Sequence, residues 1–341
     1  MRKPFVVIVL ALGISGGARQ DSATSIQVVV SDASGAPVAG LTAADFQLSL
    51  DRQRLPIASA TSDPSVASEV IVLFDVSASV DFTLGQGSAA KSLLPSVRAW
   101  IGSLPASGDR WRLGTIAKRV SLGPTFTGDK ADLERSAAAL LGLAEGDRFG
   151  PSPVWDGVDA AITALESRTG RKAIVVLTDG RTTGNRIGLT AVTRRALAAR
   201  IPVSPICTGA GLMFQLEKNQ VLMVDPGIAL EQLAKETGGR YIADPPVQLQ
   251  PDRQRVAMSP GEGGGQSIAP WLTDLSKLGA ILNRVQAEMR GSYVIAFEPP
   301  PPDGRRHEVD VKVTKPGVTV RTQRVYVAPA ATGAATAATA R

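Results

Sequence analysis

Three oxygen-bearing side chains follow a short apolar run in the first third of the chain. Asp75, Ser77 and Ser79 stand as Asp-x-Ser-x-Ser directly after the apolar run 70–74. A short, wholly apolar run is typical of a strand buried on both faces of a parallel sheet, and such sheets bind ligands just outside the carboxyl ends of their strands. Carboxylate and hydroxyl oxygens are hard donors that suit Mg²⁺, although Mn²⁺ or Ca²⁺ can also occupy an oxygen site. The triplet therefore predicts a metal-binding loop at a strand end.

Two further segments could bring oxygen donors to the same edge. Asp179 lies in Thr178-Asp179-Gly180 after a second apolar run, and Ser152 lies in the loop 150–153 ahead of a predicted helix. A single Asp at a strand end or helix start is more often an ordinary cap. The metal site is therefore predicted from the joint set, which is Asp75, Ser77, Ser79, Ser152 and Asp179.

This pattern resembles the metal-ion-dependent adhesion site (MIDAS) of the von Willebrand factor type A (VWFA) domain. That family carries Asp-x-Ser-x-Ser, a distant Thr, and a distant Asp in a Thr-Asp-Gly-like turn. The residues that match in kind and order are Asp75, Ser77, Ser79 and Asp179. The Thr position maps best onto Ser152, because the stretch 151–156 resembles the family's Gly-Thr-x-Leu-Tyr-Asp. Serine keeps the hydroxyl but lacks the methyl group that stiffens the threonine rotamer, so ion affinity could be altered.

The resemblance implies a role for each of these residues. Ser77, Ser79 and Ser152 would ligate the ion directly. Asp75 and Asp179 would balance its charge, directly or through water. One coordination position would stay open for an acidic side chain of a protein partner. The segment 30–46 and the strands near the C-terminus also resemble secreted bacterial VWFA-related proteins of the Acidobacteria type, so the likeness covers about residues 25–327.

The middle of the chain alternates between strand and helix patterns. Strands are predicted at 69–74, 110–117, 120–126, 172–177, 203–207 and 240–243, and helices at 89–104, 129–143, 154–168, 189–200 and 228–237. Such alternation predicts an α/β fold, a doubly wound, mostly parallel, Rossmann-like sheet. The Pro- and Gly-rich stretch 245–268 is predicted as a loop. An apolar stripe then predicts a helix packed on the sheet, through Trp271, Leu275, Leu278, Leu282, Val285 and Met289.

The two ends of the chain have β-type patterns. Strands are predicted at 26–30, 46–50 and 55–58 within an N-terminal segment 25–60, and at 292–297, 308–313 and 319–327 within a C-terminal segment 291–327. Each segment has too few strands to be stable alone. We therefore expect the two to pair into one small β-sandwich, with the VWFA domain at 69–290 inserted between them. Residues 328–341 are predicted to be a disordered tail.

Residues 1–20 have the pattern of a secretory signal peptide. Arg2 and Lys3 precede an apolar run at 5–14, which is shorter than the ~20 residues of a membrane span. Small residues at 15–18 offer cleavage sites, and an uncleaved anchor is the alternative. We expect a secreted or periplasmic protein with no membrane span after signal cleavage. The single cysteine, Cys207, lies in an apolar stretch and is expected to be a buried, inert thiol.

Composition and charge argue against nucleic-acid binding. The 341-residue chain carries 37 Lys and Arg against 31 Asp and Glu, which gives a net charge of +6. Most of the cations lie beside acids in predicted helices and turns, a pattern that favours solvated faces over a basic patch.

The leading functional hypothesis is an adhesion-type binding protein whose metal site captures an acidic group of a protein partner. A structural scaffold with a vestigial ion site is the alternative, and a metal-dependent hydrolase is a weaker one. We expect no enzyme, because hydrolases that use Mg²⁺ usually place more carboxylates and a general base near the ion. Asp156 and Asp225 are expected to be structural, and the only histidine, His307, to be an exposed strand residue.

Overall fold

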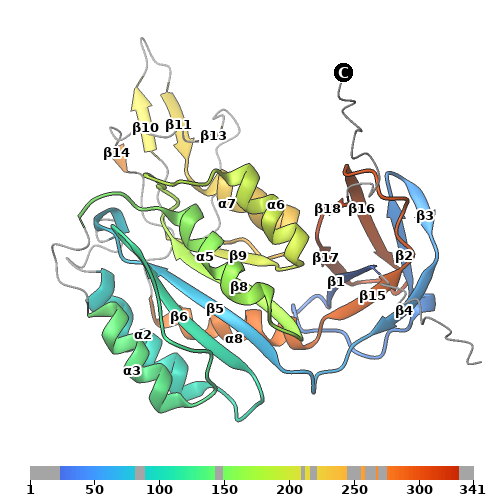
Figure 1. Ribbon diagram of the computed structural model, residues 1–341, viewed down its shortest axis with the longest axis horizontal. Helices are drawn as coiled ribbons and strands as arrows, with labels where there is room; N and C mark the ends of the chain where they lie inside the picture. Colours follow the sequence, from blue (N-terminus) through green and yellow to red (C-terminus); the bar gives the residue numbers. More distant parts are fainter. Residues whose placement is uncertain are drawn as a thin grey trace, which may run out of the picture.

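An α/β body and a smaller β-sandwich lie side by side and are joined where helix α8 (Leu278–Arg290) runs into strand β15 (Tyr293–Phe297) (Figure 1). The computed structural model describes residues 24–80, 89–142, 149–208, 212–215, 221–243, 255–257, 266–267 and 275–329. The predicted signal peptide lies outside the described residues.

A six-stranded sheet forms the centre of the α/β body. Its order is β12-β9-β8-β5-β6-β7, and its members are β5 (Ser68–Asp75), β6 (Arg110–Ile116), β7 (Val120–Leu122), β8 (Arg171–Thr178), β9 (Val203–Cys207) and β12 (Ile242–Ala243). All neighbouring strands of this sheet pair in parallel except β6 and β7, which are antiparallel to each other. Every residue of β5 is buried, as its apolar run predicts. Cys207 is fully buried at the end of β9.

Helices cover both faces of this sheet, which confirms the predicted doubly wound fold. Alternate residues of β5 point to opposite faces, so Val72 packs with α2 (Ala89–Ser103), α3 (Lys130–Leu141) and α8, whereas Leu73 packs with α5 (Val154–Glu166), α6 (Leu189–Ala199) and α7 (Gly227–Thr237). The two apolar layers hold the carboxyl ends of the strands in register at one edge.

The N- and C-terminal segments form the sandwich together. One sheet has the order β17-β1-β15-β4 and the other β18-β16-β2-β3. Besides β15, these sheets contain β1 (Thr24–Ser31), β2 (Phe46–Leu50), β3 (Gln53–Leu55), β4 (Ile57–Thr61), β16 (Arg306–Val313), β17 (Thr319–Thr322) and β18 (Val325–Val327). A 3₁₀ turn, η1 (Ala43–Asp45), precedes β2. β1 pairs with β15 and β17, and β2 pairs with β16. Both sheets therefore combine strands from the two ends, as expected.

Two strands predicted as continuous are each divided between the two sheets. The prediction at 55–58 is wrong because Pro56, which lacks a backbone N–H, separates β3 from β4. The prediction at 319–327 is wrong because Gln323 and Arg324 separate β17 from β18. The Arg324 N–H donates to Glu236 O of the α/β body instead of to a neighbouring strand. Both interruptions are corners at which the chain crosses from one sheet to the other.

A further four-stranded sheet, β13-β11-β10-β14, involves segments for which the sequence predicted no strand. Its strands are β10 (Leu212–Gln215), β11 (Val221–Asp225), β13 (Arg255–Ala257) and β14 (Gln266–Ser267). The last two fall inside 245–268, so the prediction of a loop there is wrong in part. β13 and β14 are short edge strands, which give little sequence signal because the pairing partner decides them, whereas the central strands β10 and β11 are apolar runs that the prediction missed.

Two predicted boundaries near the C-terminal part also change. The stripe predicted from 271 begins as a helix only at Leu278, after a 3₁₀ turn, η2 (Leu275–Lys277), and Trp271 lies outside the described residues. Within α8, Leu282, Val285 and Met289 do pack on the sheet. Ala328 is buried in the sandwich and does not belong to the predicted tail, and residues 330–341 lie outside the described residues. Among the described residues, no helix is both long and apolar enough to span a membrane.

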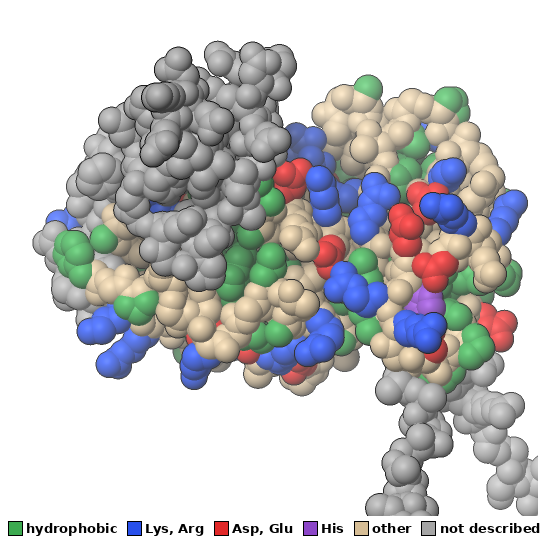
Figure 2. All heavy atoms as spheres, turned by 90° about the horizontal axis from the view of Figure 1, so that it is seen from above, with side chains coloured by type: hydrophobic (Ala, Val, Ile, Leu, Met, Phe, Trp, Pro, Cys, Tyr) green, Lys and Arg blue, Asp and Glu red, His purple; other side chains and the backbone are tan. Residues whose placement is uncertain are grey.

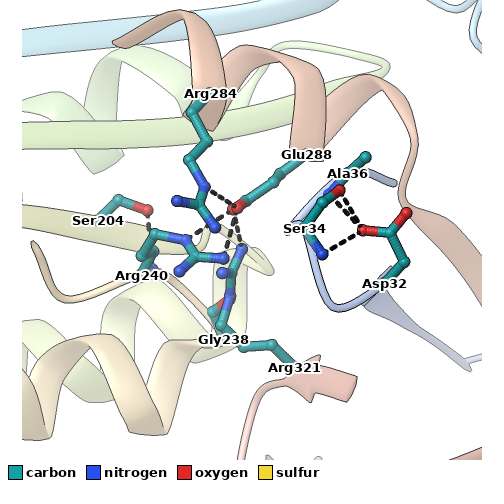
Figure 3. Close-up of polar contacts among 9 residues, drawn as sticks. All are labelled: Asp32, Ser34, Ala36, Ser204, Gly238, Arg240, Arg284, Glu288 and Arg321. Atoms are coloured by element: carbon teal, nitrogen blue, oxygen red, sulfur yellow. Dashed lines mark hydrogen bonds and ion pairs between the residues drawn. The ribbon is translucent and has the colours of Figure 1, made fainter. Parts of the chain in front are cut away.

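Glu288 of α8 joins the α/β body to the sandwich. Its side chain is 1% exposed and accepts from Arg321 of β17 (Nη2 to Oε2, 2.7 Å) and from Arg240 (Nε to Oε2, 3.0 Å). Arg284, one turn earlier in α8, lies 3.3 Å from Oε1. Figure 3 shows these three guanidinium groups arriving from different elements around the one carboxylate. Arg240 and Arg321 hold the pKa of Glu288 below its usual range despite the burial of the carboxyl.

Candidate metal site

Asp75 is the last residue of β5, and its carboxylate is the centre of the site. Its side chain is completely buried. Oδ1 accepts from Ser77 N at 3.0 Å, and Oδ2 accepts from Ser152 Oγ at 3.0 Å and from Thr178 Oγ1 at 2.7 Å. Thr178 is the last residue of the neighbouring strand β8. It lies beside Asp75 because β5 and β8 run parallel, with Phe74 paired to Leu177. Three separate chain segments therefore converge on this one carboxylate.

Ser152 reaches Asp75 because its loop is tied to the loop after β8. The Ser152 N–H donates to Thr183 Oγ1 at 3.0 Å, and Thr183 N donates back to Ser152 O at 2.9 Å. Asn185 Oδ1 accepts from Trp155 N at 2.8 Å and so holds the start of α5. The Ser152 side chain is buried, and its hydrogen bond to Asp75 orients the hydroxyl although serine lacks the methyl group of threonine.

Asp179 adds a second buried carboxylate directly after β8. Its Oδ1 accepts from Arg181 N at 3.0 Å, whereas Oδ2 is buried and has no hydrogen-bond partner among the described residues. Arg181 Nε lies 3.9 Å from Oδ2 and makes no hydrogen bond there. A buried carboxylate oxygen that accepts no hydrogen bond is unfavourable, and an arginine at 3.9 Å compensates it only weakly. This oxygen is the clearest sign that the site accommodates a further group.

Burial raises the pKa of both carboxyl groups, and the charge of Asp75 adds to the rise at Asp179. Burial raises the pKa of Asp75, against the hydrogen bonds it accepts from Ser77, Thr178 and Ser152. Burial, and then the nearby charge of Asp75, raise the pKa of Asp179 to about 7. The Arg181 N–H and the Ser79 hydroxyl oppose that rise. A bound cation would lower the pKa of both carboxyl groups, because it favours their ionised forms.

The donor set fits a hard cation. Ser77 Oγ lies 3.2 Å from Ser79 Oγ, and Ser152 Oγ lies 3.0 Å from Asp75 Oδ2. Adjacent ligands of an octahedral Mg²⁺ ion, at 2.0–2.1 Å from the metal, lie about 3 Å apart. No group of three or more His, Cys, Asp or Glu side chains suited to a metal occurs within the described parts of the chain. The site thus combines two carboxylates with hydroxyls, a set that suits Mg²⁺, Mn²⁺ or Ca²⁺ better than a softer metal.

The structure brings all five predicted residues to one edge of the sheet: Asp75, Ser77, Ser79, Ser152 and Asp179. Sequence reasoning missed the partners that orient them, above all Thr178, Thr183 and Asn185. The place of Thr178 at the end of the strand beside β5 is a signal that could have found it. Asp156 is structural, since its carboxylate accepts from the backbone N–H groups of Arg186 and Ile187.

A groove of about 450 Å³ opens beside the site. It is lined by the turn after Asp179 and by the start of α7, including Gly180, Thr182, Trp155, Ile187 and Ile228. Arg186, whose side chain is 92% exposed, lies on its rim. On the face drawn in Figure 2, the Lys and Arg side chains of the described residues are mixed with Asp and Glu and do not form one basic patch.

Comparison with known proteins yields structural likenesses only. No family model matches the sequence, and no curated protein matches it. An aerotolerance-related membrane protein from Bacteroides fragilis is 18% identical over 65% of this chain and 100% of its own, with a TM-score of 0.42. BatB from Bacteroides thetaiotaomicron is 20% identical over 57% and 92%, with a TM-score of 0.38. The VWA domain of SpRpn10 is 17% identical over 62% and 95%, with a TM-score of 0.37. All three TM-scores are below 0.5, so these likenesses carry no conclusion about function.

Proposed function

We propose that this chain is an adhesion-type binding protein that captures an acidic group of a protein partner through a Mg²⁺-assisted site. The observation that carries the proposal is the pair of buried carboxylates, Asp75 and Asp179, with serine hydroxyls between them and one carboxylate oxygen unpaired. Ser77, Ser79 and Ser152 would hold the ion, and the two Asp would balance its charge. The ion would supply a positive centre for the partner's carboxylate.

The residues of the site favour binding over catalysis. His307 is the only histidine of the chain and lies in β16 of the sandwich, so no imidazole is available as a base. Both carboxylates are engaged in the site itself. The groove beside it could receive the residues that flank the acidic group of a partner.

A scaffold with a vestigial site is the second candidate. Its support is Ser152, which stands where the resembled family has threonine. This candidate predicts that a chelator does not affect partner binding. For either function, the predicted signal peptide supports export of the protein to the periplasm or the medium.

The proposal is tested by titrating Mg²⁺ into the full chain by calorimetry. Wild type should bind the ion, and Asp75→Ala should not, while both show the same circular dichroism spectrum. A Mg²⁺-dependent pull-down from the cell envelope of the source organism, with and without chelator, then tests the partner. Equal Mg²⁺ binding by both proteins would refute the assignment of the site.

A further inference from the structure

A second cleft, of about 550 Å³, lies between the α/β body and the sandwich. Its walls come from the start of β8, from the ends of α5 and α6, and from strands β1, β4 and β15. Asp75 and Asp179 mark the carboxyl ends of the parallel strands, whereas Arg171 and Lys172 mark the amino end of β8. The cleft and the metal site are therefore at opposite edges of the sheet.

The lining of this cleft is rich in positive charge. It holds four cationic side chains, Arg168, Arg171, Lys172 and Arg200, against the two carboxylates of Asp63 and Glu166. Two positive charges therefore remain unbalanced in the lining, which a dianion would neutralise.

Two members of the lining already have partners outside it. Arg168 binds Glu69, with Nη2 2.5 Å from Oε1, and Glu166 binds Arg195 at 2.7 Å. Lys172 and Arg200, in contrast, form no ion pair with another described residue. Burial, and then the nearby charge of Arg200, lower the pKa of Lys172 against the charge of Glu166, so the two cations lie close enough to repel each other. Like charges held together in this way favour an anion between them.

Arg171 adds a buried cation behind this pair. The residue is only 7% exposed, and its Nη1 donates to the carbonyl oxygens of Asp63 and Val66. Its Nε is buried and has no hydrogen-bond partner among the described residues. The guanidinium therefore fixes one wall of the cleft.

The backbone of Arg200 supplies an independent observation. Arg200 ends α6 in the left-handed region, at φ 55° and ψ 45°, where its N–H caps Ala196 O and Leu197 O. Glycine is the residue that this position favours, because a Cβ makes the conformation costly. A strained residue that lines a cleft points to a role for its side chain.

We propose that this cleft binds a small organic phosphate, held by Lys172 and Arg200 and covered on its apolar side by Ala199 and Val294. A phosphate monoester carries close to two negative charges at neutral pH, which matches the unbalanced charge of the lining. Arg and Lys are the usual partners of phosphate oxygens. The volume is within the range of small-molecule sites.

The test titrates phenyl phosphate, inorganic phosphate and uncharged benzyl alcohol into the full chain by calorimetry, at fixed ionic strength and with chelator present. Phenyl phosphate should bind most tightly and benzyl alcohol should not bind. Arg200→Gly and Lys172→Gln should each weaken phenyl phosphate binding by about tenfold or more. Arg54→Gln, which removes an exposed cation of β3, is the matched control and should bind as wild type does.

Arg200→Gly separates a ligand role from a structural one. Because glycine suits the backbone there, the variant should keep or raise the melting temperature while losing affinity. Absence of phenyl phosphate binding by wild type, or equal binding by Arg200→Gly, would overturn the proposal. Asp75→Ala should bind phenyl phosphate normally, so this cleft and the metal site can fail independently.

A last arm identifies the source of the phosphate. Vesicles of phosphatidic acid in phosphatidylcholine, with pure phosphatidylcholine as control, are sedimented with wild type and Arg200→Gly. Binding of wild type alone to the phosphatidic acid vesicles would assign a lipid headgroup. Binding of phenyl phosphate without vesicle binding would assign a soluble phosphate ester.

Discussion

Ser152 Oγ donates a hydrogen bond to Asp75 Oδ2 at 3.0 Å, across 77 positions of sequence. This contact joins the loop before α5 to the end of β5 and places the hydroxyl among the candidate metal ligands. Ser152→Ala should weaken Mg²⁺ binding by about tenfold, the effect of one modest hydrogen-bonding group. Thr178 still donates to Asp75 in that variant, so the fold should persist. Calorimetry measures the affinity, and circular dichroism checks the fold.

Ser152→Thr is the matched variant. It retains the hydroxyl and adds the methyl group that stiffens the rotamer, so Mg²⁺ should bind at least as tightly as to wild type. A loss of affinity as large as that of Ser152→Ala would show that this hydroxyl does not contact the ion.

The stability of the chelated protein should depend on Asp179. Its pKa is raised to about 7 in the folded protein, from an ordinary 3.8, so the folded state binds the proton more tightly than the unfolded state. The free energy of unfolding should therefore fall as pH rises from about 4 to about 7, by on the order of a few kcal/mol for the coupled pair of Asp179 and Asp75. Urea unfolding at a series of pH values measures it.

Asp179→Asn is the control for that titration, because it keeps the shape of the side chain and removes the charge. The difference between wild type and the variant gives the contribution of Asp179 together with its coupling to Asp75. Saturating Mg²⁺ should flatten the wild-type profile. An identical pH profile for the two chelated proteins would contradict the raised pKa.

The sequence predicts the α/β sheet and the metal-site residues for the same reason. A buried parallel strand such as β5 must be apolar throughout, so the polar residues that follow it are conspicuous. Asp75 and Asp179 could be placed at one edge because parallel strands share their carboxyl ends. Thr178 and Thr183 escaped prediction, since a threonine at a strand end or in a loop has many ordinary roles.

The sandwich was harder to predict in detail. Its strands β3, β4, β17 and β18 are short, and the change from one sheet to the other occurs within a single β-type pattern. Pro56 is a recognisable signal for one such corner. At Arg324 the corner depends on a backbone hydrogen bond to Glu236 of the α/β body. A contact between residues so far apart in the chain cannot be predicted from local sequence.

Glu288 should contribute strongly to the stability of the junction. Glu288→Gln would remove the only carboxylate that three guanidinium groups share (Figure 3), which should cost about 3–5 kcal/mol, as when one partner of a buried ion pair is removed. Arg284→Gln is the matched control, because Arg284 is 51% exposed and lies 3.3 Å from the carboxylate. Its loss should cost at most about 1 kcal/mol. Urea unfolding of both variants measures the difference, and equal losses would contradict a buried network.

His307 is held between two carboxylates and is less exposed than its strand position predicts. Nδ1 lies 2.8 Å from Asp51 Oδ2, Nε2 lies 3.2 Å from Asp303 Oδ1, and the side chain is 13% exposed. The hydrogen bond to Asp51, and then that to Asp303, raise the pKa of His307 above its usual 6.5, against the effect of burial. A raised folded-state pKa means that this contact stabilises the sandwich fully below pH 6.5 and loses its effect as pH rises through the folded value.

Proton NMR can follow this titration without assignment, since the chain contains one histidine. The His307 ring resonances should titrate above pH 6.5, and Asp51→Asn should move the midpoint back down. Asp51 lies in the turn between β2 and β3, where its φ is 48°. Asparagine tolerates this left-handed backbone, so the β2–β3 hairpin should be retained. A midpoint at or below 6.5 in wild type, or one that Asp51→Asn leaves unchanged, would show that the two carboxylates do not hold the imidazolium.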